Sequence, residues 1–321
     1  MKFQEHREKV ERINEARHRE GLPPMEKIAI SFSGGRTSAV MTKKLWDAYQ
    51  DTRDILITFA NTGCEHEATL EFVERCATEF GWPVVWLEAV VNMEKGKGVR
   101  HKIVNFKTAA RNGEPFRAVI EKYGIFNKIN PNCTGRLKVD PMESFLSSHD
   151  FYRGKRLNYK TAIGIRADEA DRVSMYAVKA IGAIYPLVDM NFSKRDVGIE
   201  ISTWGFDLQI PGDHFGNCVW CWKKSLRKLM TVARQDEYAF DFPKEMEEKH
   251  GVDAVNKNRL SENGRAVFFR KHRSAKEIVE MAKTRQFAEY KDDSYAHGWE
   301  RELDLGGSCG DSCEIGADLE Y

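Results

Sequence analysis

Short apolar segments that alternate with helical patterns constrain the fold of this chain more than any other feature of its sequence. The segments are residues 27–32 (KIAISF), 54–59 (DILITF) and 83–87 (PVVWL), and each of the first two leads through a polar turn into a helical pattern. Residues 160–165 are a fourth candidate strand. Strands joined by helices form a parallel, doubly wound sheet, and ligands bind at the carboxyl ends of its strands. The sequence therefore predicts an α/β fold with a doubly wound, mostly parallel sheet.

Three regions are predicted along the chain. Residues 1–24 carry a charge at nearly every second position and end in a Gly-Leu-Pro-Pro breaker, which predicts an N-terminal helical extension. Residues 25–225 hold the alternating strands and helices and form the predicted nucleotide-binding domain. The alternation weakens from about residue 185, so residues 226–321 are expected to be a less regular, mainly helical region with a helix near residues 275–290 and a cysteine-containing tail.

The connection between the first strand and its helix has the composition of a phosphate-binding loop. Residues 33–38 read Ser-Gly-Gly-Arg-Thr-Ser. Glycines let backbone amides approach an anion, and the N-terminus of the following helix adds its dipole. No Gly-Lys-Ser/Thr follows, so this is not the Walker pattern. Taken alone, such a turn is more often an ordinary strand-to-helix connection, and the later motifs reverse that reading.

Several cations occur in later segments of the chain. Arg136 and Lys138 lie within residues 131–141 (PNCTGRLKVDP), and Arg166 follows the fourth candidate strand in a Gly-Ile-Arg-Ala-Asp-Glu turn. Arginine presents a fork that fits phosphate or sulfate oxygens, so these side chains are candidates to bind a polyanionic substrate. Surface ion pairs with the neighbouring Asp and Glu residues are the alternative.

These segments resemble, in the same order, the motifs of one superfamily. SFSGGRTS is similar to the PP-loop of ATP pyrophosphatases, and residues 59–73 (FANTGCEHEATLEFV) resemble the second motif of phosphoadenylyl-sulfate (PAPS) reductases and their relatives. Residues 131–141, 164–172 and 185–189 (YPLVD) resemble the motifs that follow. The chain thus resembles the PAPS reductase-like family of the PP-loop (adenine nucleotide alpha hydrolase-like) superfamily, over roughly residues 27–225.

The resemblance implies which residues bind the nucleotide. Its phosphates would lie on the loop, the second strand would contact the adenosine, and Mg²⁺ would bridge the phosphates. The implied cofactor-binding residues are Ser31, Ser33, Gly34, Gly35, Arg36, Thr37 and Ser38 at the phosphates, Phe59, Asn61, Thr62 and Gly63 at the nucleoside, and Gly164 and Arg166 beyond them. The implied catalytic cations are Arg136, Lys138 and Arg166.

Seven cysteines, an odd number, favour thiol or metal chemistry over a disulfide framework. Cys218 and Cys221 form a Cys-x-x-Cys pair that can chelate a metal or cycle as a dithiol. In the relatives that this region resembles, adenylyl-sulfate reductases and DNA-phosphorothioation ATPases, cysteines matching Cys133, Cys218 and Cys221 hold a [4Fe-4S] cluster. Cys313 is the candidate fourth ligand, and Cys309 and Cys313 are candidate catalytic thiols.

The cysteine pattern leaves three alternatives open. Zinc competes for the same thiolates, the fourth iron of a cluster can stay open for the sulfur to be transferred, and the chain can lack a metal. The sequence also departs from the cluster-bearing reductases, because it has one cysteine at position 133 where they have an adjacent pair. It also lacks their C-terminal Glu-Cys-Gly-His type segment.

Three functions follow from the resemblance. The first is cleavage of ATP to AMP and pyrophosphate in a sulfur-transfer or adenylation reaction, with a sulfur donor such as a cysteine desulfurase as partner. The second is reduction of phosphoadenylyl sulfate or adenylyl sulfate to sulfite. The third is a non-catalytic nucleotide-binding module.

Charge and hydropathy bear on the partners. Lys plus Arg total 50 and Asp plus Glu 49, so the net charge of +1 gives no chain-wide attraction to nucleic acid. A nucleic-acid acceptor remains open but is not indicated by charge. No run reaches the roughly 18 apolar residues of a membrane span, and the first twenty residues lack the apolar segment of a secretory signal. We therefore expect a cytoplasmic protein without membrane association.

Overall fold

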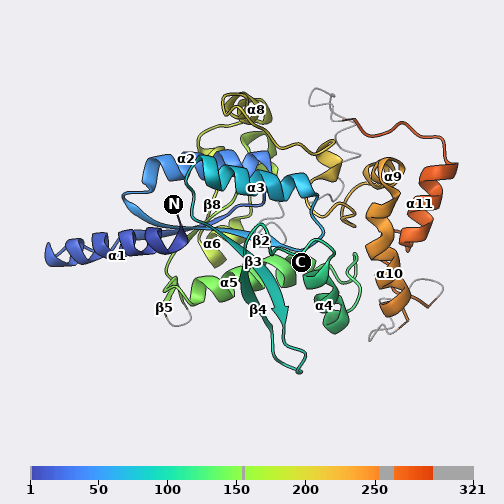
Figure 1. Cartoon of the computed structure of the whole chain (residues 1–321), viewed down its shortest axis with the longest axis horizontal. Coiled ribbons are helices and arrows are strands. Elements are labelled where there is room, and N and C mark those ends of the chain that lie inside the picture. Colours follow the sequence, from blue (N-terminus) through green and yellow to red (C-terminus); the bar gives the residue numbers. More distant parts are fainter. Residues whose placement is uncertain (1, 154–155, 253–263, 292–321) are drawn as a thin grey trace.

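A central sheet with helices on both faces forms the core of the computed structural model, which describes residues 2–153, 156–252 and 264–291 (Figure 1). In the described part of the chain the sheet has six strands in the order β4-β3-β2-β1-β7-β8. Five are parallel, and β4 alone pairs antiparallel, with β3. The strands are β1 (Glu26–Ser31), β2 (Arg53–Asn61), β3 (Val84–Val91), β4 (Val99–Val104), β7 (Lys160–Ala162) and β8 (Ala183–Ile184). The predicted α/β fold with a mostly parallel sheet is confirmed.

Both faces of the sheet are covered, as a doubly wound fold requires. Helices α2 (Arg36–Tyr49) and α3 (Glu67–Glu79) lie on one face, and α4 (Glu114–Tyr123) and α5 (Asp140–Ser147) on the other (Figure 1). Successive side chains of a strand point to opposite faces. Accordingly, Ile28 and Ile30 of β1 pack in the hydrophobic cluster of α2 and α3. Ala29 packs instead with Phe145 and Leu146 of α5.

The edge strand β4 was not predicted. Its sequence, VRHKIV, mixes apolar and charged residues, and only Val99 is buried. An edge strand has a single neighbour in the sheet, so it needs no continuous apolar run of the kind that identified the central strands. A two-stranded ribbon of β5 (Tyr152–Arg153) and β6 (Arg156–Leu157) lies outside this sheet.

Helices dominate the rest of the described chain. Helix α1 (Phe3–Arg19) joins the sheet through a 2.9 Å hydrogen bond between His6 Nε2 and the Ile55 carbonyl. The later helices are α6 (Met175–Ile181), α7 (Pro186–Asp189), α8 (Lys194–Ser202), α9 (Leu226–Gln235), α10 (Asp241–His250) and α11 (Ala275–Thr284). Helices α9, α10 and α11 lie together at one end of the molecule (Figure 1). The boundaries of the three predicted domains stay predictions.

Helix α11 is shorter than the predicted helix at residues 275–290. It begins with a capping box of Ser274 and Glu277 and ends at Thr284. The Arg234 guanidinium donates to the carbonyls of Ala282, at 2.6 Å, and Arg285, at 3.1 Å. A side chain from another helix thus satisfies carbonyls that the helix end leaves without partners. None of the described helices is both long and apolar enough to cross a membrane.

Candidate functional site

The turn from β1 to α2 lies at the carboxyl edge of the sheet, as predicted for the phosphate-binding loop. Gly34 has φ +80°, and a Cβ atom on it would lie 2.6 Å from Thr69 Cγ2 and 3.0 Å from Val73 Cγ2 of α3. Both the backbone angle and the close approach require glycine here. The loop is therefore pressed against the first turns of α3.

Hydroxyl groups hold the loop in shape. Ser38 Oγ accepts from the Ser33 backbone N–H at 3.2 Å, lies 2.8 Å from Ser33 Oγ and donates to the Gly35 carbonyl at 3.0 Å. The N-cap of α2 is Gly35, and no side chain caps the first turn of the helix. Uncapped N–H groups at a helix N-terminus attract anions. The loop therefore has the geometry of a phosphate site.

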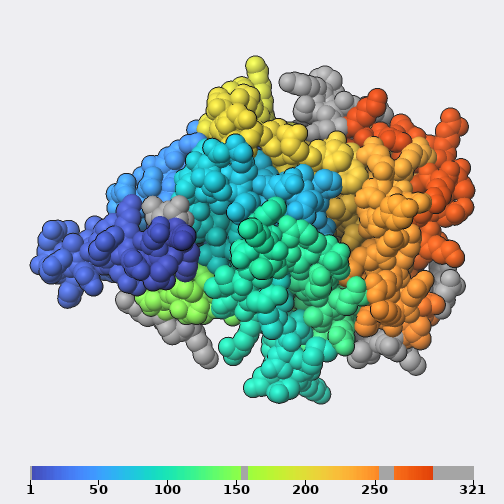
Figure 2. Space-filling model, viewed as in Figure 1, coloured from blue at the N-terminus to red at the C-terminus, as the bar shows by residue number. Residues whose placement is uncertain are grey.

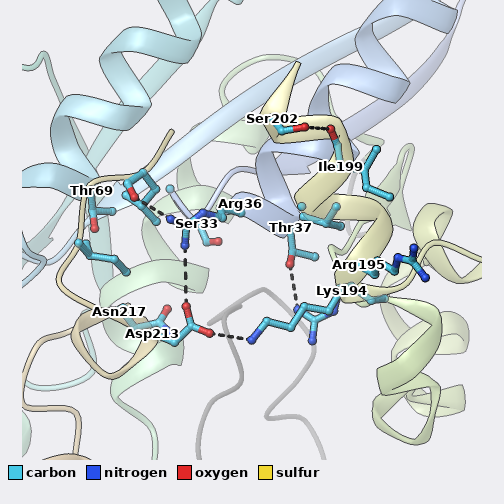
Figure 3. Close-up of a pocket in the computed structure, with 18 residues that line it drawn as sticks. Ser33, Arg36, Thr37, Thr69, Lys194, Arg195, Ile199, Ser202, Asp213 and Asn217 are labelled. Atoms are coloured by element: carbon cyan, nitrogen blue, oxygen red, sulfur yellow. Dashed lines mark hydrogen bonds and ion pairs between the residues drawn. The ribbon is translucent and has the colours of Figure 1, made fainter. Parts of the chain in front are cut away.

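A cavity of about 590 Å³ opens over the loop (Figure 3). This volume is in the range of small-molecule and cofactor sites. Most of its wall comes from the loop, α8 and the segment from Leu208 to Asn217, and Thr69 of α3 and Arg166 complete it. The lining residues are Ser33, Gly34, Gly35, Arg36, Thr37, Thr69, Arg166, Lys194, Arg195, Val197, Gly198, Ile199, Ser202, Leu208, Ile210, Asp213, Gly216 and Asn217.

Arg166 is the predicted cation that reaches this cavity. It is 6% exposed, and its Nη1 donates to Thr37 Oγ1 of the loop at 3.1 Å. Its other nitrogens pair with Asp168, at 3.1 Å, and Glu169, at 3.3 Å. Arg166 therefore fits both the anion-binding prediction and the ion-pair alternative. Its ion pairs with Asp168 and Glu169 orient the guanidinium toward the loop.

Two further cations in the cavity are held by carboxylates. Arg36 makes a two-pronged ion pair with Asp207, at 2.7 and 3.0 Å, and also donates to the Leu208 carbonyl at 2.8 Å. Lys194 Nζ lies 3.0 Å from Asp213 Oδ2 (Figure 3). Partly exposed pairs of this kind contribute about 1 kcal/mol or less. An anionic ligand can therefore compete for both cations.

The predicted nucleoside residues are not among those that line this cavity, and their role stays a prediction. The Asn61 side-chain amide donates to Glu88 Oε1, at 2.8 Å, and to the Ala110 carbonyl, at 2.9 Å. Thr62 Oγ1 hydrogen-bonds to Glu65, and Gly63 packs against backbone, since a Cβ there would lie 2.9 Å from Gly113 N. Buried polar groups already paired in this way hold the chain rather than a ligand.

Other predicted binding residues lie behind the loop. Phe59 is buried and packs edge-on against Trp86, with ring centroids 4.8 Å apart. Ser31 is buried beside Met142, with Oγ 3.7 Å from Sδ. Ser38 is the internal clamp of the loop, and Gly164 is not among the lining residues.

Arg136 and Lys138 also lie away from the cavity lining. Arg136 pairs with Asp140 at 2.8 Å, four residues on, and lies over the Tyr123 ring. Lys138 is buried, with Nζ 4.0 Å from Glu65 Oε1. Arg136 thus forms an ion pair of the alternative interpretation, whereas the partner of Lys138 is a distant glutamate that this interpretation did not name.

Residues 218–221, which we call the cysteine loop, adjoin the cavity, but within the described part of the chain their two thiols are not grouped with a third side chain as metal ligands. Cys221 N donates to the Cys218 carbonyl at 3.0 Å, and Cys218 Sγ lies 3.4 Å from Thr62 Oγ1. Cys133 packs against the same hydrophobic cluster as Cys218. Among the residues that the structure describes, no three His, Cys, Asp or Glu side chains are grouped to hold a metal ion. The predicted set of Cys133, Cys218 and Cys221 is thus not assembled, and Cys309 and Cys313 lie outside the described residues.

Two thiols of this region, those of Cys64 and Cys218, favour their neutral form. Burial, and then the Glu65 carboxylate, raise the pKa of both Cys64 and Cys218. The Lys138 ammonium opposes the rise in the pKa of Cys218 without overcoming it. Since the thiolate is the nucleophile and the metal ligand, neither cysteine is activated in this conformation.

Lys224 organises the segment that contributes to the cavity and carries Cys218 and Cys221, a role that no sequence motif indicated. It is 6% exposed, and its Nζ donates to the carbonyls of His214, Val219 and Cys218 at 2.6, 2.7 and 3.0 Å. The segment so held, residues 213–221, lines the cavity at its start and carries the cysteines at its end. The polar lining residues that sequence reasoning missed are Thr69, Lys194, Arg195, Ser202, Asp213 and Asn217.

Comparisons with known proteins agree with this loop and fold. Residues 27–178 match the family model of the phosphoadenosine phosphosulfate reductase domain. Over 300 residues the chain is 32% identical to an uncharacterized nin region protein, ORF290, of Escherichia phage lambda, covering 91% of this chain and 96% of that protein. The chain belongs to the PAPS reductase-like family of PP-loop proteins. Residues 33–38 are accordingly the PP-loop of this PAPS reductase-like protein.

A solved structure that resembles the PAPS reductase-like chain is an NH3-dependent NAD synthetase from Campylobacter jejuni in complex with nitrate ion. It is 13% identical, the match covers 64% of this chain and 85% of that one, and the TM-score is 0.29. At this TM-score the likeness adds nothing to the assignment.

Proposed function

We propose that this PAPS reductase-like protein binds ATP in the cavity over the PP-loop and cleaves it to AMP and pyrophosphate during an adenylation or sulfur-transfer reaction. One observation carries the proposal: the loop, the uncapped N-terminus of α2 and the buried Arg166 converge on one cavity of nucleotide size. Two further cations that line the cavity, Arg36 and Lys194, form partly exposed ion pairs.

The loop amides and these cations would stabilise the charge that develops on the leaving pyrophosphate. Preorganised donors act most strongly where charge appears in the transition state. Arg166 is preorganised by Asp168 and Glu169, so its fork needs little reorganisation to meet a phosphoryl group. Asp207 and Asp213 offer the carboxylate oxygens that Mg²⁺ prefers, and they would hold the ion once the nucleotide recruits Arg36 and Lys194. Bound Mg²⁺ would supply further charge neutralisation.

The iron-sulfur cluster that the family resemblance implies does not fit the thiols as they lie. Cys133, Cys218 and Cys221 do not form a metal-holding group within the described chain. We therefore derive no step through a cluster or zinc. A sulfur donor such as a cysteine desulfurase is a partner that sulfur transfer would need.

Product analysis tests the proposal. ATP and Mg²⁺ are incubated with the protein under anaerobic, reducing conditions, and nucleotides and phosphates are separated by anion-exchange chromatography. AMP and pyrophosphate in equal amounts, reduced in Arg166→Ala, are expected. Exclusive formation of ADP would refute cleavage between the α and β phosphates. Tight ATP binding without any turnover would favour a non-catalytic module.

Sulfonucleotide reduction is the second candidate, favoured by the match of residues 27–178 to the reductase domain. That reaction requires a nucleophilic thiol, and burial raises the pKa of Cys218. Cys309 or Cys313 would therefore have to serve. If the double variant Cys309→Ser/Cys313→Ser still formed sulfite from phosphoadenylyl sulfate, neither residue would have that role.

A further inference from the structure

A tight turn of basic residues precedes α11. Phe269 and Arg273 form an antiparallel bridge, with Phe269 N donating to the Arg273 carbonyl at 3.2 Å. The residues at the tip, Lys271 and His272, have φ +58° and +54°. We call residues 270–273, Arg-Lys-His-Arg, the basic turn.

The two residues at the tip of the basic turn adopt a backbone conformation that is unfavourable for their side chains. The left-handed region is unfavourable for residues with a Cβ, and glycine or asparagine usually occupies such positions. Here two consecutive long cationic or aromatic side chains, Lys271 and His272, occupy it. Lys276 follows in the first turn of α11, where the helix dipole disfavours a cation. Strain of this kind is concentrated at functional sites.

The charges of the basic turn are presented to solvent. Lys271 and His272 are exposed, as is Lys276. Within the described ranges, neither Lys271 nor Arg273 forms an ion pair. The nearby carboxylates accept from backbone instead: Glu247 from Phe268 N and Ala275 N, and Glu277 from Ser274 N. The net charge of +1 for the whole chain conceals this local excess of positive charge.

A hydrogen bond and an aromatic contact connect the basic turn and the residues before it to residues 220–223, next to the candidate site. Arg270 Nη2 donates to the Lys223 carbonyl at 2.9 Å, two residues after Cys221. The Phe268 ring packs against Trp220, with centroids 5.0 Å apart, and both rings are buried. Trp220 lies between Cys218 and Cys221, and three residues before them in the same segment, Asp213, Gly216 and Asn217, line the cavity. A ligand on the basic turn is therefore held beside the cysteine loop. The space-filling view shows the α9 to α11 end of the molecule, where the turn joins α11 (Figure 2).

We infer that the basic turn is a docking surface for the phosphate backbone of a nucleic acid. Lys271 and Arg273, which form no ion pair within the described residues, suit a regularly charged polyanion, whose condensed counterions they would release on binding. The inference rests on the proposed function in one respect, since it names a nucleic acid as the class of acceptor for that reaction.

Fluorescence anisotropy tests the docking surface directly. Fluorescein-labelled single-stranded RNA and DNA of about 20 nucleotides, and the DNA duplex, are titrated with the full chain between about 50 and 200 mM salt. In Lys271→Glu/Arg273→Glu we expect affinity for the probe that binds best to fall by about tenfold or more, and the slope of log K against log salt to fall by about one to two. The matched control is Lys95→Glu/Lys97→Glu, which changes two exposed lysines of another turn and should leave both values unchanged.

A second variant separates binding from folding. Lys271→Gly suits φ +58°, so the melting temperature should stay equal or rise while nucleic-acid affinity falls. The docking surface is disproved if wild type binds none of the probes, if the double variant binds as wild type does, or if the control loses as much. Binding of a poly-glutamate peptide but of no nucleic acid would overturn it in favour of an acidic protein partner. ATP binding measured by calorimetry on the same proteins should not change; its absence in wild type would count against the proposed function and leave the docking result standing.

Discussion

Replacing Gly34 by alanine should be among the most damaging single-methyl additions in this protein. The left-handed backbone at φ +80° costs about 1–2 kcal/mol for a residue with a Cβ. The added Cβ would also lie 2.6 Å from Thr69 Cγ2 and 3.0 Å from Val73 Cγ2, and overpacking of this kind costs about 1–3 kcal/mol. The free energy of unfolding should therefore fall by about 2–5 kcal/mol, and ATP affinity should fall as the loop moves off α3.

Gly96 offers a matched control. It has φ +82°, nearly the angle of Gly34, but a Cβ there would meet nothing within 4 Å. Gly96→Ala should therefore cost only the backbone term of about 1–2 kcal/mol. The difference between the two variants isolates the close approach of the PP-loop to α3.

Urea unfolding followed by circular dichroism measures both variants, and calorimetry measures ATP binding. The double variant Gly34→Ala/Thr69→Ser removes the Cγ2 atom in the way and should recover part of the packing cost, but none of the backbone cost. Equal losses in Gly34→Ala and Gly96→Ala, or no recovery in the double variant, would refute the reasoning.

Three further predictions concern buried ionisable groups. Arg166→Lys should weaken ATP binding about tenfold, since lysine cannot present a two-pronged donor to a phosphate; calorimetry that finds unchanged affinity would place the nucleotide elsewhere. Lys224→Met should leave three carbonyls without their charged donor and lower the free energy of unfolding by about 3 kcal/mol in urea. A loss below about 1 kcal/mol would show that Lys224 does not hold this segment in place. Burial raises the pKa of Glu247 from 4.5 to about 7, so the folded state binds this proton more tightly than the unfolded state. The contribution of Glu247 to stability should therefore decrease as pH rises from 4.5 to 7, by about 3 kcal/mol in total. Glu247→Gln should remove this pH dependence; equal pH profiles for variant and wild type would show that Glu247 does not cause it.

Local sequence determined the elements that lie at the floor of the site. The apolar runs at residues 27–32 and 54–59 became β1 and β2, and the Ser-Gly-Gly turn lies where the first strand meets its helix. These features depend on neighbours in the sequence, because strand burial and loop conformation follow from local pattern and glycine positions. The end of the helix predicted at residues 275–290 was placed wrongly, since Arg234 of α9 contributes to its cap.

Tertiary structure decided which side chains face the ligand. Asn61 ends β2 at the expected edge, but its side chain points into the protein, where Glu88 and the Ala110 carbonyl accept from its amide. Arg136 has a local partner four residues away, whereas Arg166 reaches the loop 129 positions earlier in the chain. Sequence shows that a residue can bind an anion, but the three-dimensional neighbours decide whether that capacity is already used.

The far wall of the cavity was beyond local reasoning. Lys194 and Asp213 come from segments that carry no recognisable motif, and only the packing of α8 and of residues 208–217 over the PP-loop brings them to the cavity. For Cys133, Cys218 and Cys221 the sequence pattern predicted a metal site, but the described residues do not form a group of metal ligands. The sequence by itself determined the family, the sheet and the phosphate loop, since these rest on short-range pattern. The tertiary structure decided which charged residues line the cavity and which carboxylates pair with them, since both depend on contacts between residues far apart in the chain.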